Sequence, residues 1–572
     1  MDNKSFRIGL CMAGAVSAGA YTAGVMDYLL EALEEWERQR GMPGIPAHKV
    51  LIPVIGGASA GGMTAVVTAS SLNEERQSVP VPSQRDLLKE HPENKFYNTW
   101  VDLLGEDMFS KMLETSDIEK GNIISLLNSR FIDEIAHKIT GRPVGQVREI
   151  PSFFEKPLKI FTTLSNLEGF DYNIDFNPAE KREKYIMTVH NDYACFGLYE
   201  NDIQKDKVPP GWMPLNFTDR NSVETAKKAA MATGAFPFGL EPRILNRNGD
   251  DVRNIKWLKK YFVNGPEKPQ EYKTLNVDGG MINNEPFEKV RSLLDDITQK
   301  EFSNTLGAKE LNKINIEHST FVNTVLMIDP FPSKPKKDRE PFNYDKSLFS
   351  VLGKLFTAVT NQMKVKAEDY MLAMEDTHAS QYLITPARHF KDAEGKTEEV
   401  SGDMAIACGT LGGFGGFISK EFRVHDYYLG RFNCEIFLRD YFTVPEKAIE
   451  ENEIFRKGYE GIDKARFKSA KSNSYQIIPI FTDRPAKGYF SMPVFSNGSD
   501  WPTIKEGVID AYRPKIRKRV QKITLNLFEL GFVNRFLIFA GSKIVLNRML
   551  TNKLIEAIKK NFKDWGLLIN NR

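Results

Sequence analysis

The stretch that decides the fold is residues 48–72, "HKVLIPVIGGASAGGMTAVVTASSL". Its apolar first part predicts a buried strand over 48–57, and residues 60–72 predict a helix. The turn between them carries a G-x-S-x-G pattern with Ser59 at its centre, flanked by Gly57 and Gly61. At such a turn a serine hydroxyl is lifted clear of the sheet, and small neighbours let the backbone pass closely. The pattern predicts a nucleophile elbow at Ser59, and a tight turn packed by small residues is the alternative.

The residues before this stretch repeat the same order of elements. Residues 7–13 predict a buried strand, and residues 15–20 predict a turn of small residues. Residues 21–40 then predict a helix, because Val25, Leu29, Leu33 and Trp36 recur at helical spacing. A further core strand is predicted within 321–332, "FVNTVLMIDPFP". This alternation favours an α/β fold.

The composition is that of a globular protein with more than one structural unit. The chain has 572 residues, of which 41% are hydrophobic and 27% are charged, and its formal net charge is +2. The four cysteines, at positions 11, 195, 408 and 434, are too few and too scattered for a disulfide framework or a zinc site. They fit a reducing compartment, and we expect a cytoplasmic location. The N-terminus imitates a signal peptide, but its apolar part is short and interrupted by Gly14.

A serine nucleophile needs a base, and the sequence offers two kinds of candidate. None of the eight histidines stands where a catalytic role is required, although His425 beside Asp426 is the most suggestive. Asp278, in "TLNVDGGMINNEP" (274–286), follows an extended run and precedes two glycines that let the chain turn away. A carboxylate at the end of a strand can face the end of another strand and act as a base there. A plain Asp-Gly-Gly turn is the alternative for this position.

Four blocks of the chain stand in a characteristic order: "IGLCMAGAVSAGAYTAGVMDYLLEALEE" (8–35), "GGASAGGM" (56–63), "AMATGAFPFGLEP" (230–242) and "VDGG" (277–280). Together and in this order, these blocks resemble those of the patatin-like phospholipases. The resemblance implies a three-layer α/β core with a mostly parallel central sheet and a Ser–Asp dyad that hydrolyses lipid acyl esters without histidine. Carried over by position, it makes Ser59 the nucleophile and Asp278 the base, and it implies an oxyanion hole of backbone N–H groups at Gly14, Ala15 and Val16. It implies no metal and no organic cofactor.

The N-terminal loop departs from the pattern of this family, which usually reads Gly-Gly-Gly-x-Arg/Lys-Gly. A positive φ is costly for Ala15 and Val16 because both residues carry a Cβ, so we expect the loop geometry to differ from that of the family. Ala18 replaces the usual cation, which weakens a phosphate-binding role more than it weakens ester hydrolysis. The segment 409–438, which opens "GTLGGFGGF", resembles one found in a long bacterial branch of the family, and it lacks the spacing of a nucleotide-binding loop.

The sequence predicts three regions. Residues 1–335 form the catalytic core, 336–445 form a helical extension packed on it, and 446–572 form a C-terminal region that is basic from about residue 511. The extension includes the amphipathic stretch 347–376, for which a core helix and a lid or acyl-chain wall are both open. The charged run 446–473 predicts a solvated helix or a linker.

The basic C-terminal region predicts peripheral contact with an anionic membrane, and a helical cap with a solvated basic face is the alternative. No signature of nucleic-acid binding accompanies it. Between residues 511 and 563 the acidic residues are Glu529 and Glu556, and the basic residues are Arg513, Lys515, Arg517, Lys518, Arg519, Lys522, Arg535, Lys543, Arg548, Lys553, Lys559, Lys560 and Lys563.

Together these features predict a serine hydrolase that cleaves acyl esters of lipids through an acyl-enzyme. Two alternatives remain open from the sequence: a catalytically idle lipid-binding or scaffold protein on the same fold, and a Ser-His-Asp esterase. The sequence does not define the lipid head group, the acyl position or the oligomeric state.

Overall fold

The computed structural model describes residues 5–570 with internal gaps. The gaps are residues 120–121, 142–147, 175–184, 264–268, 304–306, 308–310, 312, 333–343, 348–349, 352–353, 356–357, 359–380, 392–393, 482–491 and 528–544. Most of the amphipathic stretch 347–376, together with Arg535 and Lys543, therefore lies outside the described residues.

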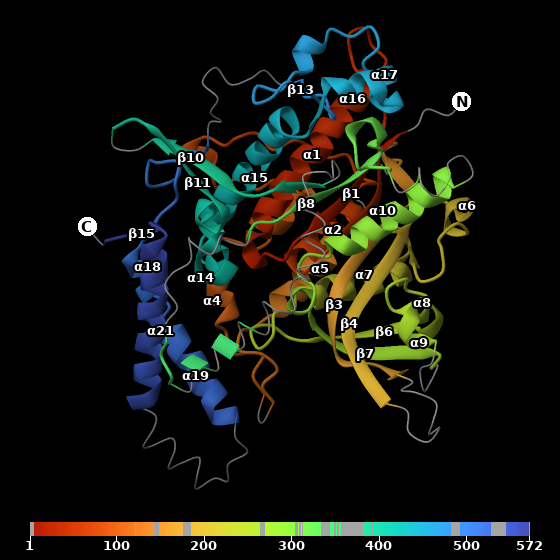
Figure 1. Cartoon of the computed structure of the whole chain (residues 1–572). Helices are drawn as coiled ribbons and strands as arrows, with labels where there is room; N and C mark the ends of the chain where they lie inside the picture. Colours follow the sequence, from red (N-terminus) through yellow and green to blue (C-terminus); the bar gives the residue numbers. More distant parts are fainter. Residues whose placement is uncertain are drawn as a thin grey trace.

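The fold is built on a nine-stranded, mostly parallel sheet (Figure 1). Along its main path the strand order is β5-β4-β3-β2-β1-β8-β9. The strands are β1 (Phe6–Met12), β2 (Val50–Gly57), β3 (Phe154–Ile174), β4 (Tyr185–Leu198), β5 (Met213–Leu215), β6 (Arg243–Asn248), β7 (Glu271–Asp278), β8 (Asn323–Ile328) and β9 (Gln381–Ile384). Strands β2, β1, β8 and β9 each run parallel to their neighbours, as expected for buried strands joined by helical connections. The predicted α/β class is confirmed.

Helices cover both faces of the sheet and bury two separate apolar cores. The larger core includes side chains of α1 (Gly19–Gln39), α2 (Ala60–Ser71), α7 (Arg220–Thr233) and α15 (Lys420–Asp440). The smaller core lies on the other face, where α10 (Phe287–Phe302) packs Val290 and Leu294 against residues such as Val54 and Phe161. The strands predicted within 7–13, 48–57 and 321–332, and the helices predicted over 21–40 and 60–72, are all present.

Strand β3 brings the second half of the core close to the first. Its start pairs in parallel with β2, and further along it pairs antiparallel with β4 and with β7. The β3–β7 pairing places Asp278, the last residue of β7, opposite Leu164. The ends of β7 and β2 therefore lie close together along the same edge of β3, where Leu164 pairs with Asp278 and Thr162 with Gly57, although the two strands are more than 200 residues apart in the sequence.

The region after residue 335 is folded onto the core through buried helix contacts. Strand β9 extends the main sheet beside β8, and α15 packs along α1. A buried ion cluster joins these two helices: the Asp27 carboxylate of α1 pairs with Arg431 of α15 and with Arg76, and it accepts a hydrogen bond of 2.6 Å from the Tyr427 hydroxyl. Burial by itself would raise the pKa of Asp27, but the two guanidinium groups outweigh it and hold this pKa below its usual value.

The charged run 446–473 is only in part the solvated helix or linker that the sequence predicts, because most of its charged residues are exposed but several of its apolar residues are buried. It forms two short helices, α16 (Glu446–Glu451) and α17 (Glu453–Gly458), whose apolar residues Ile449, Ile454 and Phe455 are buried. The ring of Phe455 lies 5.4 Å from the ring of Phe6 at the start of β1. The prediction missed this buried side because charged residues dominate the composition, whereas a few apolar residues at helical spacing determine how these turns pack.

His48 is buried beside Phe455 of α17 and makes the stability of the fold depend on pH. Its ring lies among Trp36, Phe455 and Tyr459, and its Nε2 is 2.7 Å from the carbonyl oxygen of Ile477. Burial lowers the pKa of His48 to about 4 from its ordinary value of 6.5. The fold therefore favours the neutral imidazole, and the stability that this provides is present above pH 6.5 and is lost as the pH falls toward 4.

We predict that replacing His48 by Gln removes this pH dependence. Protonation of the buried ring should cost the wild type about 3 kcal/mol of unfolding free energy between pH 6.5 and pH 4. The Gln side chain keeps an N–H donor for Ile477 but does not titrate. Denaturant unfolding of both proteins at several pH values measures the effect, because the stability difference between them should shrink or reverse as the pH falls. A difference that stays constant from pH 7 to pH 4 would contradict the prediction.

Candidate active site

Ser59 occupies a strained turn between β2 and α2. Its backbone angles are φ 50° and ψ −126°, a conformation that L-residues rarely adopt. The turn lies against the end of β1, where the N–H of Ala58 donates to the carbonyl of Met12 at 3.1 Å. A Cβ on Gly61 would lie 2.2 Å from that same carbonyl oxygen, and a Cβ on Gly57 would lie 2.5 Å from the carbonyl carbon of Gly61. The small residues of the G-x-S-x-G pattern are therefore required by the close passage of the backbone.

The hydroxyl of Ser59 meets the carboxylate of Asp278. The Oγ of Ser59 donates to Oδ2 of Asp278 at 2.7 Å, and both residues are 5% exposed. The other carboxylate oxygen, Oδ1, accepts a hydrogen bond of 2.7 Å from the N–H of Gly280. The Ser165 hydroxyl of β3 donates to the Asp278 backbone carbonyl at 2.8 Å. The carboxylate is thus held in one orientation, with one oxygen directed at the serine.

Two residues near Ser59 were not identified from the sequence. The Thr233 hydroxyl, at the end of α7, accepts a hydrogen bond of 2.9 Å from the backbone N–H of Ser59. A Cβ on Gly14 or on Gly280 would lie within 2.5 Å of the Asn284 side-chain oxygen, so Asn284 lies between the N-terminal loop and the turn after Asp278. Thr233 lies within the block 230–242, one of the four blocks that resemble the family. That resemblance is the signal by which the sequence could have identified it.

The loop expected to supply oxyanion donors lies directly beside Ser59. A Cβ on Gly14 would be 2.9 Å from the Cβ of Ser59. The N–H of Gly14 points to the carbonyl of Asn284 at a long 3.4 Å, whereas no hydrogen bond among the described residues uses the N–H of Ala15 or Val16. Val16 has φ 48°, so it does adopt the positive φ that was expected to be costly, while Ala15 keeps a negative φ.

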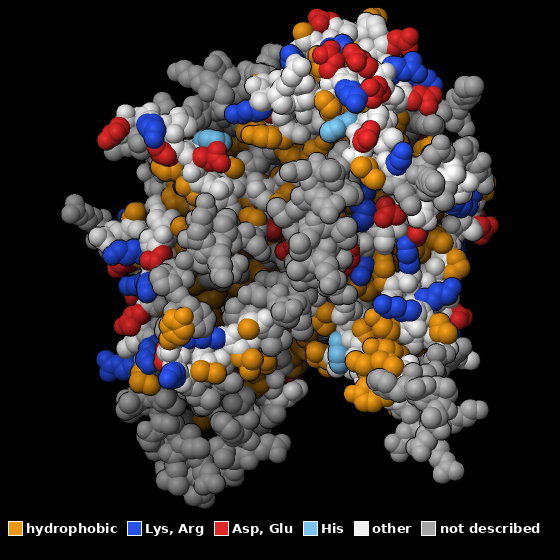
Figure 2. Space-filling view, in the orientation of Figure 1, with side chains coloured by type: hydrophobic (Ala, Val, Ile, Leu, Met, Phe, Trp, Pro, Cys, Tyr) orange, Lys and Arg blue, Asp and Glu red, His pale blue; other side chains and the backbone are white. Residues whose placement is uncertain are grey.

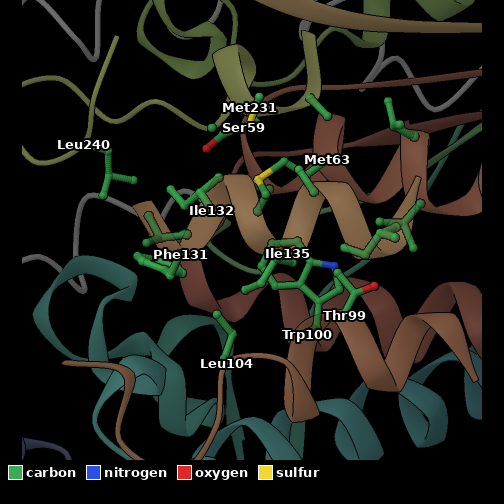
Figure 3. A pocket seen from close by; sticks show the side chains of 18 of the residues that line it. Ser59, Met63, Thr99, Trp100, Leu104, Phe131, Ile132, Ile135, Met231 and Leu240 are labelled. Carbon is green, nitrogen blue, oxygen red and sulfur yellow. The ribbon is translucent and has the colours of Figure 1, made fainter. Parts of the chain in front are cut away.

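An apolar cavity begins at Ser59 and Asp278. It is a narrow cavity of about 90 Å³ that is partly open to solvent. Figure 3 shows Ser59 and Met231 at one end of the cavity and Thr99, Trp100 and Leu104 at the other, with Met63 and Ile135 between them. The apolar wall comes from α2, α5 (Arg130–Ile139), α7, the short helices η1 (Val16–Ala18), η3 (Asn98–Asp102) and η9 (Gly415–Phe417), and loops. It comprises Val16, Ala60, Met63, Val66, Val67, Trp100, Leu104, Phe131, Ile132, Ile135, Ala136, Ile139, Ala230, Met231, Phe236, Leu240 and Phe417.

No histidine lies among the described residues that line this cavity. His425 is fully buried within α15, where its Nδ1 is 2.8 Å from Oδ1 of Asp426. In the part of the chain that the structure describes, no group of His, Cys, Asp and Glu side chains is arranged to hold a metal ion. The Ser59 hydroxyl bonds to Asp278. The Ser59 N–H bonds to the hydroxyl of Thr233.

The structure thus brings a serine hydroxyl and a carboxylate together at one end of an apolar cavity. Among known proteins, the model of the patatin-like phospholipase family matches residues 10–291 of this chain. An uncharacterized protein of Sinorhizobium fredii, y4iI, is 32% identical over 539 residues, which is 84% of this chain and 71% of that protein. The chain belongs to the patatin-like phospholipase family, and this membership indicates lipid acyl hydrolase activity.

We predict that Gly61→Ala destabilises the elbow far more than a matched change nearby. The new methyl group would meet the backbone of Met12, which cannot move without displacing β1, and such overpacking costs about 1 to 3 kcal/mol or more. In the control, Gly234→Ala, the nearest atom is the Met63 sulfur at the end of a flexible side chain, so we expect a smaller loss. Denaturant unfolding of both variants provides the comparison. Equal losses of stability would show that the close passage at Gly61 is not a tight constraint.

Proposed function

We propose that this protein is a serine hydrolase that cleaves acyl esters of lipids through a dyad of Ser59 and Asp278, without a metal or an organic cofactor. The observation that carries the proposal is the 2.7 Å hydrogen bond from the Ser59 hydroxyl to the Asp278 carboxylate at one end of an apolar cavity. An ester places its acyl chain in this cavity, which brings its carbonyl carbon close to the Ser59 Oγ. The long apolar wall suits a fatty acyl chain.

In the proposed reaction, the Ser59 Oγ attacks the carbonyl carbon while Oδ2 of Asp278 takes the hydroxyl proton. The N–H groups of Ala15 and Val16, with that of Gly14, donate to the developing oxyanion. Asp278 returns its proton to the leaving alcohol, and an acyl-enzyme remains on Ser59. Water that Asp278 deprotonates then attacks the acyl-enzyme, which releases the fatty acid and restores the dyad.

We further propose a cytoplasmic protein that contacts anionic membranes through α19 (Arg513–Leu527) and α21 (Val545–Asp564), which pack against each other. Their exposed basic residues are Lys515, Arg517, Lys518, Lys522, Arg548, Lys553, Lys560 and Lys563. Three apolar side chains of α21, Met549, Leu550 and Leu554, are also 38–46% exposed. Figure 2 shows hydrophobic side chains next to Lys and Arg side chains at the lower left, where Figure 1 places these two helices. No helix among the described residues has the length and apolar character that a membrane span requires.

Other basic residues of this region serve the fold. Arg519 is buried, pairs with Asp117 at 2.8 Å and donates to backbone carbonyls of the segment 114–126. Lys559 and Arg513 both pair with Asp510. Removing the whole C-terminal region would therefore disturb the core, and point substitutions of exposed residues test membrane contact more cleanly.

We predict that Ser59→Ala and Asp278→Asn each lower the turnover of a p-nitrophenyl acyl ester by at least about 10³-fold, with no further loss in the double variant. The losses should not add, because the two residues perform one proton transfer and one attack together. A fluorophosphonate probe should label the wild type and not Ser59→Ala. Thermal unfolding of each variant controls for misfolding.

Turnover close to that of the wild type in Ser59→Ala would contradict the proposed nucleophile. A loss of only a few-fold in Asp278→Asn, together with a complete loss on replacing a histidine, would favour a Ser-His-Asp esterase. A folded wild type that neither turns over esters nor reacts with the probe would favour an idle lipid-binding protein.

We predict that changing Lys553, Lys560 and Lys563 together to Gln weakens binding to anionic liposomes by tens- to about 100-fold at low salt. Each lysine near an anionic surface contributes about 1 kcal/mol, and this contribution is screened as salt increases. The matched control changes Lys396, Lys447 and Lys457 to Gln, which are also exposed but lie outside these helices. Co-sedimentation with anionic and neutral liposomes measures binding. Equal weakening in the two triple variants, or equal binding to neutral liposomes, would contradict this surface.

A further inference from the structure

The loop beside Ser59 is held by a segment outside the residues that the family model matches. Residues 407–417 form η8 (Ala407–Gly409), α14 (Thr410–Gly413) and η9 (Gly415–Phe417), which lie against the loop 14–19. The fully buried Ser17 connects them: its hydroxyl donates to the carbonyl of Gly413 and accepts a hydrogen bond of 3.0 Å from the N–H of Gly416. This segment therefore contacts the loop through two directional bonds as well as through packing.

The contact occurs where the loop is strained. Val16 is β-branched and has φ 48°, a conformation that persists only where the surroundings impose it. A Cβ on Gly413 would lie 3.0 Å from the Cβ of Val16 and 3.1 Å from the carbonyl oxygen of Ala15. The backbone of Gly413 thus forms a wall against the two residues whose N–H groups are the proposed oxyanion donors.

The segment is itself in an unusual conformation that two helices hold in place. Leu411, Gly412 and Gly413 have φ values of 54°, 64° and 97°, so three successive residues are in the left-handed region. The N–H of Leu411 donates to Oδ1 of Asn561, on the C-terminal helix α21, at 2.7 Å. At the start of the segment, the Asp426 carboxylate of α15 accepts the N–H groups of residues 407 and 408 at 2.7 and 2.9 Å.

We propose that Ser17 and Asn561 are positioning residues for the oxyanion loop, so that the docked C-terminal helix α21 maintains the orientation of the donors beside Ser59. The proposal rests on the hydrolase function proposed above. The path runs from Asn561 to Leu411, through the left-handed turn to Gly413, and from there to Ser17 and Val16. Neither Ser17 nor Asn561 lines the apolar cavity. Their loss should therefore lower kcat, which depends on the oxyanion donors, and leave KM nearly unchanged.

The test compares Asn561→Leu with Asn561→Asp. Leucine is close to asparagine in size but cannot accept the N–H of Leu411, whereas aspartate keeps an acceptor oxygen. With p-nitrophenyl butyrate as the probe, we expect kcat to fall about tenfold or more in Asn561→Leu, with KM within about twofold of the wild type. Asn561→Asp should retain most of the wild-type kcat. Ser17→Ala, at the other end of the path, should reproduce the loss of kcat, and it decides the question if Asn561→Leu does not fold.

Lys559→Met is the control for a general loss of stability of α21. It breaks the pairs of Lys559 with Glu506 and Asp510 at a position two residues from Asn561, and neither pair involves the segment 407–417. We expect it to lower the thermal midpoint without changing kcat. The proposal is overturned if kcat is unchanged in both Asn561→Leu and Ser17→Ala, if only KM changes, or if Lys559→Met lowers kcat equally. A wild type without turnover that depends on Ser59 overturns the proposed function and this role together.

Discussion

The positive φ of Ser59 is the constraint around which the site is arranged. The turn that holds this serine is so tight that Gly57 and Gly61 cannot carry side chains, and Gly61 lies directly against the end of β1. Because β1 and β2 are parallel neighbours, the end of β1 lies where the turn must pass, and the N-terminal loop that follows β1 emerges beside the serine. One strained residue therefore determines which residues can surround the hydroxyl and from which strands they come.

The site also needs a carboxylate next to the Ser59 hydroxyl. Strand β3 meets this requirement because it pairs with β2 at its start and with β7 further along, so that β7 ends at Asp278 beside the elbow. The carboxylate is fixed by the N–H of Gly280 and its backbone is fixed by Ser165. Once the strands are paired in this register, the hydrogen bond between Ser59 and Asp278 needs no further rearrangement of the chain.

The C-terminal half packs against the N-terminal half through buried contacts. Helix α15 packs on α1 through a buried cluster in which Asp27 is matched by two arginines, an arrangement that offsets the cost of burying these charges. Asp426 of α15 and Asn561 of α21 accept hydrogen bonds from the segment 407–417. This segment in turn contacts the N-terminal loop through Ser17. Phe417 also lines the cavity, so the surroundings of Ser59 extend well beyond residue 291, where the family model ends.

The sequence by itself determined the elements whose signal is local. The elbow at Ser59, the strands and helices on either side of it and the strand that ends at Asp278 all follow from short patterns of apolar, small and turn-forming residues. Only the tertiary structure decided which distant residues meet: Thr233 and Asn284 near Ser59, Ser17 with Gly413, and Asn561 with Leu411. It also decided that apolar residues of the charged run 446–473 are buried and that basic residues such as Arg519 serve the fold. The physical reason is that periodicity and turn chemistry act over a few residues, whereas contacts, burial and the pairing of charges depend on how strands and helices far apart in the chain pack together.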